Sequence, residues 1–286
     1  MCTLYPHQVR AVEFVMERLR ARKGSLLCYE MGLGKTLIGV SVAKEFTCVY
    51  VFLPAYLEAA WRDAFAFAEV PLPTFVSYDA RTFPRVPAHA LVILDESQYV
   101  KNRESQRWKR LVPSVRATRN RLLLTGTPML NRHCELWTQL HLLGYGASWM
   151  AFAERYCGAR MRSIRRRGRF VRVLDTSAST RGKELRALTE EHGFQYCDKS
   201  VLETKLPPKQ VRVLRVKEPV RVPHSGHLHS DVMRDYQLRA AQRAGNAAWR
   251  AAILREVGAR DAVIFARHVC VLDALAEIFP GAARID

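Results

Sequence analysis

The chain has 286 residues, of which 49% are hydrophobic, so it can bury the core of one large domain or of two small ones. Its longest apolar runs, such as SLLCY and ALVIL, have the length of a strand and are far shorter than the ~20 residues of a membrane helix, and the N-terminus carries no signal-peptide pattern. We therefore expect a soluble, intracellular protein that is neither secreted nor embedded in a membrane.

The net charge and the cysteine pattern further narrow the class of protein. The formal net charge is +18, and a field of this sign attracts polyanions such as nucleic acids, with solubility alone as the alternative explanation. The seven cysteines are scattered, and no two have CxxC spacing, which indicates neither a zinc site nor a disulfide framework. We expect reduced thiols.

The chain falls into three regions. Residues 1–145 alternate short apolar runs with amphipathic stretches, which is typical of an α/β fold with a parallel sheet wrapped by helices. Residues 146–210 combine helical pieces with an arginine-dense segment and predict a mostly helical insertion. Residues 211–286 contain a second set of strand and helix patterns, such as DAVIFARHV and LDALAEIF, which predict the beginning of a second α/β unit, too short for the usual open sheet.

The segment YEMGLGKT follows the first apolar run and precedes an amphipathic stretch, which is the context of a phosphate-binding loop. Its glycines let main-chain N–H groups close on phosphate oxygens, the helix N-terminus adds a favourable dipole, and Lys35 reaches the outer phosphates. Because Tyr29 stands where the strict GxxxxGKT pattern has glycine, a structural turn is the alternative. The predicted nucleotide-binding residues of the loop are Glu30, Met31, Gly32, Leu33, Gly34, Lys35 and Thr36.

Two acids, Asp95 and Glu96, follow the apolar run ALVIL. A P-loop ATPase needs one acid at the end of a neighbouring strand for the magnesium shell and a second to position water. We predict that Asp95 and Thr36 hold the metal and that Glu96 activates water, with Lys35 as the third catalytic residue. Acids that merely cap a loop are the alternative, which the P-loop earlier in the chain disfavours.

A third motif, TGTP, follows the apolar run RLLL. Two hydroxyls around a glycine at the carboxyl end of a β-strand can hydrogen-bond the acid motif and relay the nucleotide state to a bound strand of nucleic acid. We predict this coupling role for Thr125, Gly126 and Thr127, with a simple turn as the alternative. The position of TGTP after the P-loop and the acid pair favours coupling.

These motifs, in this order, resemble the SWI/SNF-like branch of the superfamily 2 helicases and translocases. LYPHQVRAVEF is similar to the adenine-sensing entry motif, and the resemblance implies that Gln8 contacts adenine. The successive motifs of the first lobe are matched by EMGLGKT, LPAYLEAAW, VSYD, DESQYVKN and LLLTGTPMLNRHCELW, so the resemblance covers roughly residues 4–145. FAERYCGA and the spacing to ELRALTEE are most similar to the annealing-helicase members, and RDAVIFARHVCVLDALAEIF is similar to the opening of the family's second lobe.

The resemblance implies a RecA-like fold for lobe one (1–145), an interlobe insertion (146–210) and an incomplete second RecA-like lobe (211–286). It further implies ATP hydrolysis with ATP and Mg2+ as cofactors, and translocation on double-stranded or branched DNA in DNA repair. RNA stays open as a substrate. A cytoplasmic, nucleoid-associated or nuclear location follows from such a substrate.

The chain departs from the family in three places. Gln98 stands where the DExH motif usually has histidine, and the resemblance implies an altered link between hydrolysis and movement. Only Lys199 is left of an LRR-type motif before the second lobe. The chain stops at ARID, before the motifs that carry the family's arginine finger, so we expect poor hydrolysis by this polypeptide alone.

Three explanations stay open for the absence of these second-lobe motifs: a second polypeptide supplies them, the gene is a truncated remnant, or the chain is a fragment of a longer protein. The rival function is a non-catalytic module that binds ATP and DNA. A small-molecule kinase is disfavoured because TGTP and DESQ would have no role in it.

The segment RMRSIRRRGRFVRV holds seven arginines and no acid, with Gly168 at the expected tip of a hairpin. Such a hairpin can straddle duplex phosphates and recognise shape and charge without reading sequence, and a solvated loop is the alternative. The candidate DNA-binding residues are Arg165, Arg166, Arg167 and Arg169.

Other aromatic and imidazole groups favour structural roles. His224, His227 and His229 could bind zinc or nickel, but an exposed loop is favoured because no acid or cysteine nearby, apart from Asp231, completes a ligand set. Two tryptophans, Trp61 and Trp137, lie on amphipathic stretches and are interpreted as core anchors rather than platforms for base stacking.

Overall fold

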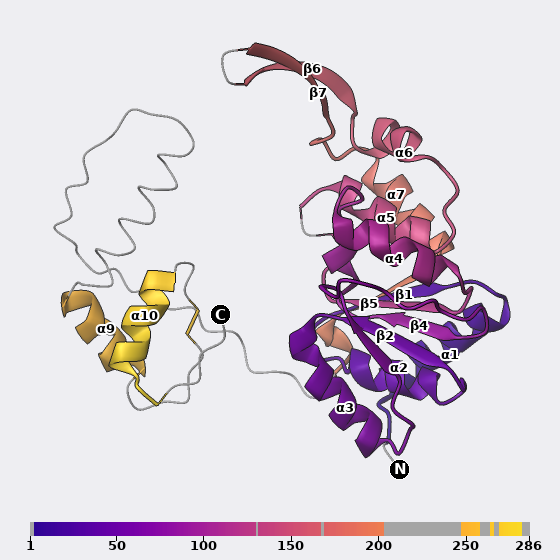
Figure 1. Ribbon diagram of the computed structural model, residues 1–286, viewed down its shortest axis with the longest axis horizontal. Helices are drawn as coiled ribbons and strands as arrows, with labels where there is room; N and C mark the ends of the chain where they lie inside the picture. Colours follow the sequence, from indigo (N-terminus) through magenta and orange to yellow (C-terminus); the bar gives the residue numbers. More distant parts are fainter. Residues whose placement is uncertain are drawn as a thin grey trace. The chain divides into compact units, whose positions relative to one another are not determined.

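A computed structural model describes residues 3–129, 131–166, 169–202, 247–257, 264–265 and 269–281 (Figure 1). The chain divides into two compact units, Met1–Lys205 and Leu206–Asp286. The first unit contains every motif from the P-loop to TGTP.

The first unit is built on a six-stranded sheet with the order β3-β2-β4-β5-β1-β8. Every neighbouring pair in it is parallel, as expected for an α/β fold. Strands β1 and β4 are buried along their whole length, which explains why they are continuous apolar runs without alternation. The strands are β1 (Ser25–Tyr29), β2 (Val49–Leu53), β3 (Thr74–Ser77), β4 (Leu91–Leu94), β5 (Arg121–Thr125) and β8 (Phe194–Cys197).

Helices cover both faces of this sheet (Figure 1). Alternate side chains of each strand point to opposite faces, so Leu26 lies in one buried cluster and Leu27 in the other. One face packs against α1 (Pro6–Arg20), α2 (Lys35–Ala43) and α3 (Glu58–Phe67). The other packs against α4 (Gln106–Arg116), α5 (Leu136–Leu142), α6 (Trp149–Tyr156) and α7 (Gly182–Glu191).

Short 3-10 turns lie between these elements. They are η1 (Ala55–Leu57), η2 (Ser97–Val100), η3 (His133–Glu135) and η4 (Lys199–Val201). Turn η2 directly follows the acid pair, and η3 follows TGTP, so both turns begin near the carboxyl ends of the central strands. The expected core positions of Trp61 and Trp137 are confirmed, because both side chains are buried.

The edge strand β8 corrects the expected boundary of lobe one. It lies within residues 146–210, yet it pairs in parallel with β1, with Leu26 opposite Phe194. The sheet therefore does not end at residue 145, and α7 and β8 belong to it rather than to a separate insertion. The physical reason is burial: Phe194 is 3% exposed and covers the edge of β1.

The arginine-dense segment forms the expected hairpin. Strand β6 (Arg160–Arg166) pairs antiparallel with β7 (Arg169–Asp175), and Arg166 lies opposite Arg169. Arg167 and the expected tip at Gly168 lie outside the described residues.

In the second unit, the structure describes helices α9 (Ala247–Val257) and α10 (Val269–Ile278), joined by an ion pair between Arg250 and Glu277 of 2.9 Å. The strands expected in 211–286 and the histidines 224, 227 and 229 lie outside the described residues. Over the described parts of the chain, no helix is both long and apolar enough to cross a membrane.

Candidate nucleotide-binding site

The predicted phosphate loop connects β1 to α2. Gly32 and Gly34 both have a positive φ, of 88° and 76°, a conformation that glycine adopts without steric cost. Helix α2 begins at Lys35, and its first turn contains no acidic side chain that would compete for the helix N-terminus. The loop therefore has the backbone shape and the local charge that a phosphate group requires.

Lys35 folds back onto its own loop. Its Nζ donates a hydrogen bond of 2.9 Å to the carbonyl oxygen of Tyr29 and a longer one of 3.4 Å to that of Glu30. Burial lowers the pKa of Lys35, and the nearby carboxylates of Glu96 and Asp95 act in the opposite direction. The ammonium group thus lies between the loop and the acid pair.

Gln8 joins α1 to the loop. Its Oε1 accepts a hydrogen bond from the main-chain N–H of Tyr5 at 2.9 Å, and its Nε2 donates to the carbonyl oxygen of Leu33 at 3.2 Å. The side chain is 3% exposed, and a Cβ added to Gly34 would clash with its Nε2. Gln8 therefore holds the position of the P-loop, and a contact with adenine stays a prediction.

Asp95 is buried and held by three other residues. The indole Nε1 of Trp61 donates to Oδ2 at 2.7 Å, and the main-chain N–H of Glu96 donates to Oδ1 at 2.9 Å. The hydroxyl of Tyr78 donates to the carbonyl oxygen of Asp95 at 2.8 Å. Burial raises the pKa of Asp95, while the hydrogen bond from Trp61 lowers it, so the indole favours the ionised carboxylate.

A chain of hydrogen bonds connects the acid pair with TGTP. The Oγ1 of Thr125 donates to Oε1 of Gln98, and Nε2 of Gln98 donates to Oε2 of Glu96, each at 2.6 Å. Thr125 Oγ1 also accepts from the main-chain N–H of Thr127 at 3.0 Å. Glu96 has a φ of +48°, an uncommon conformation for a residue other than glycine, and such strain is concentrated at functional sites.

The P-loop and TGTP are also neighbours. A Cβ added to Gly126 would lie 3.6 Å from Lys35 Nζ and 3.5 Å from the carbonyl oxygen of Tyr29. The structure therefore brings together Lys35, the acid pair with Gln98, and TGTP, which the sequence places in three separate segments. Thr36 lies in the first turn of α2, directly after Lys35.

Two residues that contribute to the site were not predicted as site residues from the sequence. Trp61 is interpreted there only as a core anchor, although its indole N–H holds Asp95. Gln139 is fully buried on α5, accepts from the hydroxyl of Ser97 at 3.4 Å and donates to the carbonyl oxygen of Pro128 at 2.7 Å. Gln139 lies in the run LWTQLHLL, which also contains Thr138 and His141, so the sequence gives no signal that singles out Gln139.

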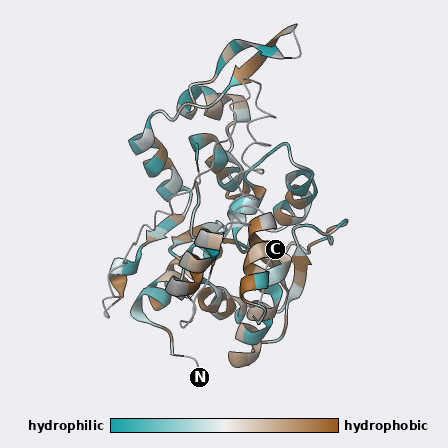
Figure 2. Ribbon diagram, turned by 90° about the vertical axis from the view of Figure 1, so that its left-hand side faces the viewer, coloured by the Kyte–Doolittle hydropathy of each residue, from teal (hydrophilic) through white to brown (hydrophobic). Residues whose placement is uncertain are grey.

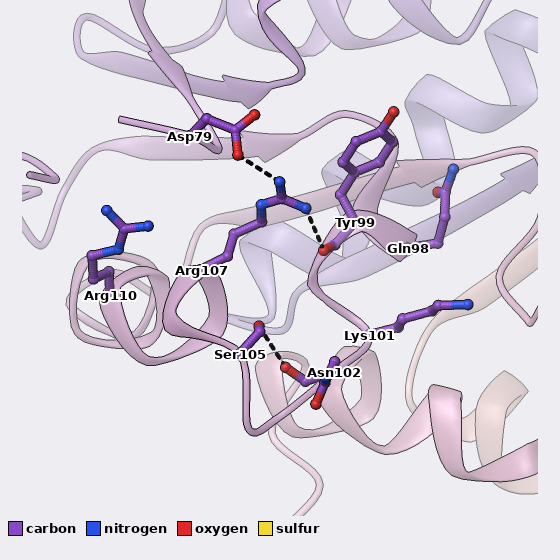
Figure 3. A pocket seen from close by; sticks show the side chains of 8 residues that line it. All are labelled: Asp79, Gln98, Tyr99, Lys101, Asn102, Ser105, Arg107 and Arg110. Atoms are coloured by element: carbon purple, nitrogen blue, oxygen red, sulfur yellow. Dashed lines mark hydrogen bonds and ion pairs between the residues drawn. The ribbon is translucent and has the colours of Figure 1, made fainter. Parts of the chain in front are cut away.

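A cavity of about 620 Å³ opens beside Gln98 (Figure 3). Arg107 on its wall donates to Asp79 at 2.5 Å and to the carbonyl oxygen of Tyr99 at 3.3 Å. Arg110 and Lys101 add two further cations to the lining. The cavity joins the coupling residue Gln98 to a predominantly cationic surface.

The residues present fit a nucleotide with its metal ion. Gly32 and Gly34 give the loop its tight backbone conformation, Lys35 supplies a cation beside it, and Asp95 supplies a carboxylate of the kind that magnesium prefers. Of the candidate DNA-binding arginines, Arg165 is exposed on the hairpin, Arg166 and Arg169 are placed there by their backbone, and Arg167 is not described.

A parallel sheet that carries a phosphate loop and an acid pair at the carboxyl ends of its strands defines a P-loop nucleotide-binding domain of RecA-like architecture. The family model of the SNF2-related domain matches residues 76–219, which is half of the chain. The chain belongs to this family.

Curated relatives agree with this assignment. The chain is 26% identical to the mouse (Mus musculus) "DNA annealing helicase and endonuclease ZRANB3", over 96% of this chain and 30% of that protein. It is 28% identical to the bovine (Bos taurus) "SWI/SNF-related matrix-associated actin-dependent regulator of chromatin subfamily A-like protein 1", over 96% of this chain and 33% of that protein. The chain thus spans about a third of the length of these relatives.

Solved structures show the same fold. The "Sulfolobus solfataricus SWI2/SNF2 ATPase core in complex with dsDNA" matches with a TM-score of 0.55 and 18% identity, over 97% of this chain and 57% of that one. The "Sulfolobus solfataricus SWI2/SNF2 ATPase core domain" matches with a TM-score of 0.54 and 19% identity, over 71% of this chain and 45% of that one.

Proposed function

We propose that this chain binds ATP and Mg2+ and is the nucleotide-binding lobe of an ATP-dependent DNA translocase. The observation that carries the proposal is the continuous hydrogen-bonded path from Thr125 through Gln98 to Glu96. A loop that only bound nucleotide would not need this path. It joins the acid that orients water to the motif that relays nucleotide state, which is what a motor requires.

Each residue of the site has a defined role in this proposal. Lys35 contacts the outer phosphates, Thr36 and Asp95 hold the magnesium shell, and Glu96 orients the attacking water through its carboxylate. When bound, ATP would supply the phosphoryl group, and Mg2+ would neutralise the negative charge of the phosphates. The hydrogen bond from Trp61 opposes the rise that burial causes in the pKa of Asp95 and orients its carboxylate, so Trp61 acts as a positioning residue.

Double-stranded or branched DNA is the proposed substrate. The net charge of +18, the arginine hairpin and the cationic cavity beside Gln98 all favour a polyanion. The names of the relatives refer to DNA annealing and chromatin, and the Sulfolobus core was solved with duplex DNA. We infer a location where DNA is found, in a nucleus or a nucleoid.

The test compares ATP turnover of the wild-type chain with that of Lys35→Ala and Glu96→Gln, with and without duplex or forked DNA. We expect DNA to stimulate the wild type, Lys35→Ala to lose nucleotide binding, and Glu96→Gln to keep binding while losing turnover by about 100-fold or more. Unchanged turnover in either variant would contradict the catalytic roles of Lys35 and Glu96. Nucleotide binding with negligible turnover in the wild type would instead support a non-catalytic module or one half of a split motor.

A further inference from the structure

One face of the β6–β7 ribbon combines exposed apolar side chains with arginines. Paired residues of an antiparallel ribbon share a face, and the faces alternate from one pair to the next. The pairs Met161 with Leu174, Ser163 with Arg172, and Arg165 with Phe170 therefore form one face, which we call the Phe170 face. Figure 2 shows the mixture of hydrophilic and hydrophobic residues along this ribbon at the top of the view.

The apolar side chains of this face are open to solvent. Phe170 is 79% exposed, Met161 52% and Leu174 36%. The three apolar side chains thus share one face of the ribbon. Arg165 and Arg172 are exposed on the same face, so a partner meets apolar and cationic groups together.

The two faces differ in charge. Arg160 and Arg162 lie on the opposite face and form ion pairs with Asp175, at 3.6 and 3.1 Å. Hydrogen bonds from Ser177 and Arg162 hold the pKa of Asp175 well below its usual range, so this carboxylate stays ionised. Among the six residues of the Phe170 face there are two arginines and no acid, so this face carries a net positive charge.

The Phe170 face continues into the surface of lobe one. Leu174 at its base lines a cavity of about 340 Å³ together with Lys101, Arg103 and Trp149. The guanidinium of Arg103 lies over the indole of Trp149, with 4.8 Å from its Cζ to the ring centroid. Lys101 also lines the cavity beside Gln98 (Figure 3). Lys101 and Arg103 form ion pairs with Glu135 and Glu104 of the same lining, so the ring of Trp149, rather than unpaired cations, is what this cavity adds to the Phe170 face.

This combination fits nucleic acid with an unpaired base. Arginines along a groove hold phosphates, and an aromatic ring stacks on any base whose face is free. In a closed duplex the base faces are covered by their neighbours, whereas a junction between duplex and single strand offers one. We propose that the Phe170 face binds such junctions, with Phe170 stacked on the first unpaired base and Arg165 and Arg172 on the neighbouring phosphates.

This inference rests on DNA as the proposed substrate, and it adds the structure that is preferred. Its test measures equilibrium binding of the full chain, without ATP, to a blunt duplex, a single strand and a fork of equal length. Phe170→Ala is compared with the aromatic replacement Phe170→Trp. The matched control is Val171→Ala, because Val171 is the next residue along β7, is 43% exposed and lies on the opposite face.

We expect Phe170→Ala to weaken binding to the fork by about 5- to 140-fold, the range that one base–aromatic stack contributes, and to leave binding to the blunt duplex nearly unchanged. Phe170→Trp should restore the preference for the fork, and Val171→Ala should keep it. A 2-aminopurine at the first unpaired position should be quenched by the wild type and by Phe170→Trp, and not by Phe170→Ala.

The arginines are tested by salt dependence. Arg165→Ala and Arg172→Ala should weaken binding to the duplex and to the fork alike, and each should reduce the slope of log K against log salt by about 0.9 for each duplex phosphate contact that it removes. A base-stacking residue would leave this slope unchanged, so the two roles are separable.

An equal loss for duplex and fork in Phe170→Ala would overturn the inference, and so would a similar loss in Val171→Ala. If the wild type binds duplex tightly but shows no preference for the fork, only this inference fails. If the wild type binds none of the three DNAs, the proposed substrate fails with it.

Discussion

At the residue scale, Trp61 is the side chain whose role changes most between sequence and structure. Its ring is 1% exposed and packs among the residues between the sheet and α3, as a core anchor does. Its indole N–H also donates to Asp95 Oδ2, so the same side chain contributes to packing and holds the acid that we propose for the metal shell. A hydrogen bond to a charged, buried group is worth about 1.5–3 kcal/mol.

Trp61→Phe should therefore shift the pH profile of ATP turnover. Without the indole donor, the pKa of Asp95 rises further above its usual value, so protonation begins at a higher pH. The acidic limb of the profile should move to higher pH, and the magnesium requirement should rise about 10- to 100-fold, as for other residues that orient a metal ligand. Steady-state turnover at varied pH and magnesium concentration measures both.

Trp137→Phe is the control for this prediction. Trp137 is also buried, but its indole donates to the carbonyl oxygen of Ala147, remote from the acid pair. It should lower stability without moving the acidic limb. An unchanged limb in Trp61→Phe would show that the indole only fills space.

The pair Gln98 and Thr125 gives a second prediction at this scale. Gln98→Ala and Thr125→Val each break the path to Glu96, and each should reduce DNA-stimulated turnover by about 2- to 10-fold while nucleotide binding is kept. Because both changes remove the same hydrogen bond, the double variant should lose little more than either one. The measurement is kcat at saturating ATP and DNA.

Thr138→Val serves as the comparison for Thr125→Val. Thr138 is also buried, and its hydroxyl donates to the carbonyl oxygen of Glu135 outside the path. Additive losses in the double variant, or a loss of the same size in Thr138→Val, would contradict a coupling path.

At the scale of elements, the position of β8 decides where lobe one ends. The segment FQYC is four residues long, and three of its four positions are only half-buried, so its pattern alone indicates no sheet position. The parallel pairing with β1 makes it the edge of the central sheet. The apolar runs SLLCY, ALVIL and RLLL predicted β1, β4 and β5, because these strands are buried and each is followed by a recognisable motif.

Phe194→Ala tests this position. A buried phenylalanine in a sheet contributes to the core, so the variant should unfold with about 3–5 kcal/mol less free energy. Phe67→Ala, at a side chain that is 68% exposed, should change that free energy by about 0.5 kcal/mol or less. Chemical denaturation of the first unit in the full chain measures both, and a small effect of Phe194→Ala would place β8 outside the core.

At the scale of the whole molecule, the net charge and the packing of helices against the sheet affect different properties. The charge of +18 is carried at the surface and affects association with polyanions, whereas the fold depends on two apolar clusters, one on each face of the sheet. The family assignment rests on the match of residues 76–219 to the model of the SNF2-related domain. The preference for a particular DNA rests on local features such as the Phe170 face.

The sequence alone indicated the class of fold through its alternation of apolar runs and amphipathic stretches. It also located the P-loop, the acid pair and TGTP, because each of these motifs is a short contiguous pattern. It also determined the basic hairpin, since alternating β-formers around a glycine are a local signal. These residues could be identified without knowing which segments meet in space.

The tertiary structure alone decided what those residues touch. Four contacts join segments that are distant in the chain: Trp61 with Asp95, Gln98 with Thr125, Gln139 with Pro128, and β8 with β1. A hydrogen bond depends on the distance and angle between two atoms, and a sheet position depends on which apolar edge remains uncovered. Neither quantity is a property of a single segment, so the composition and periodicity of the sequence could not show them.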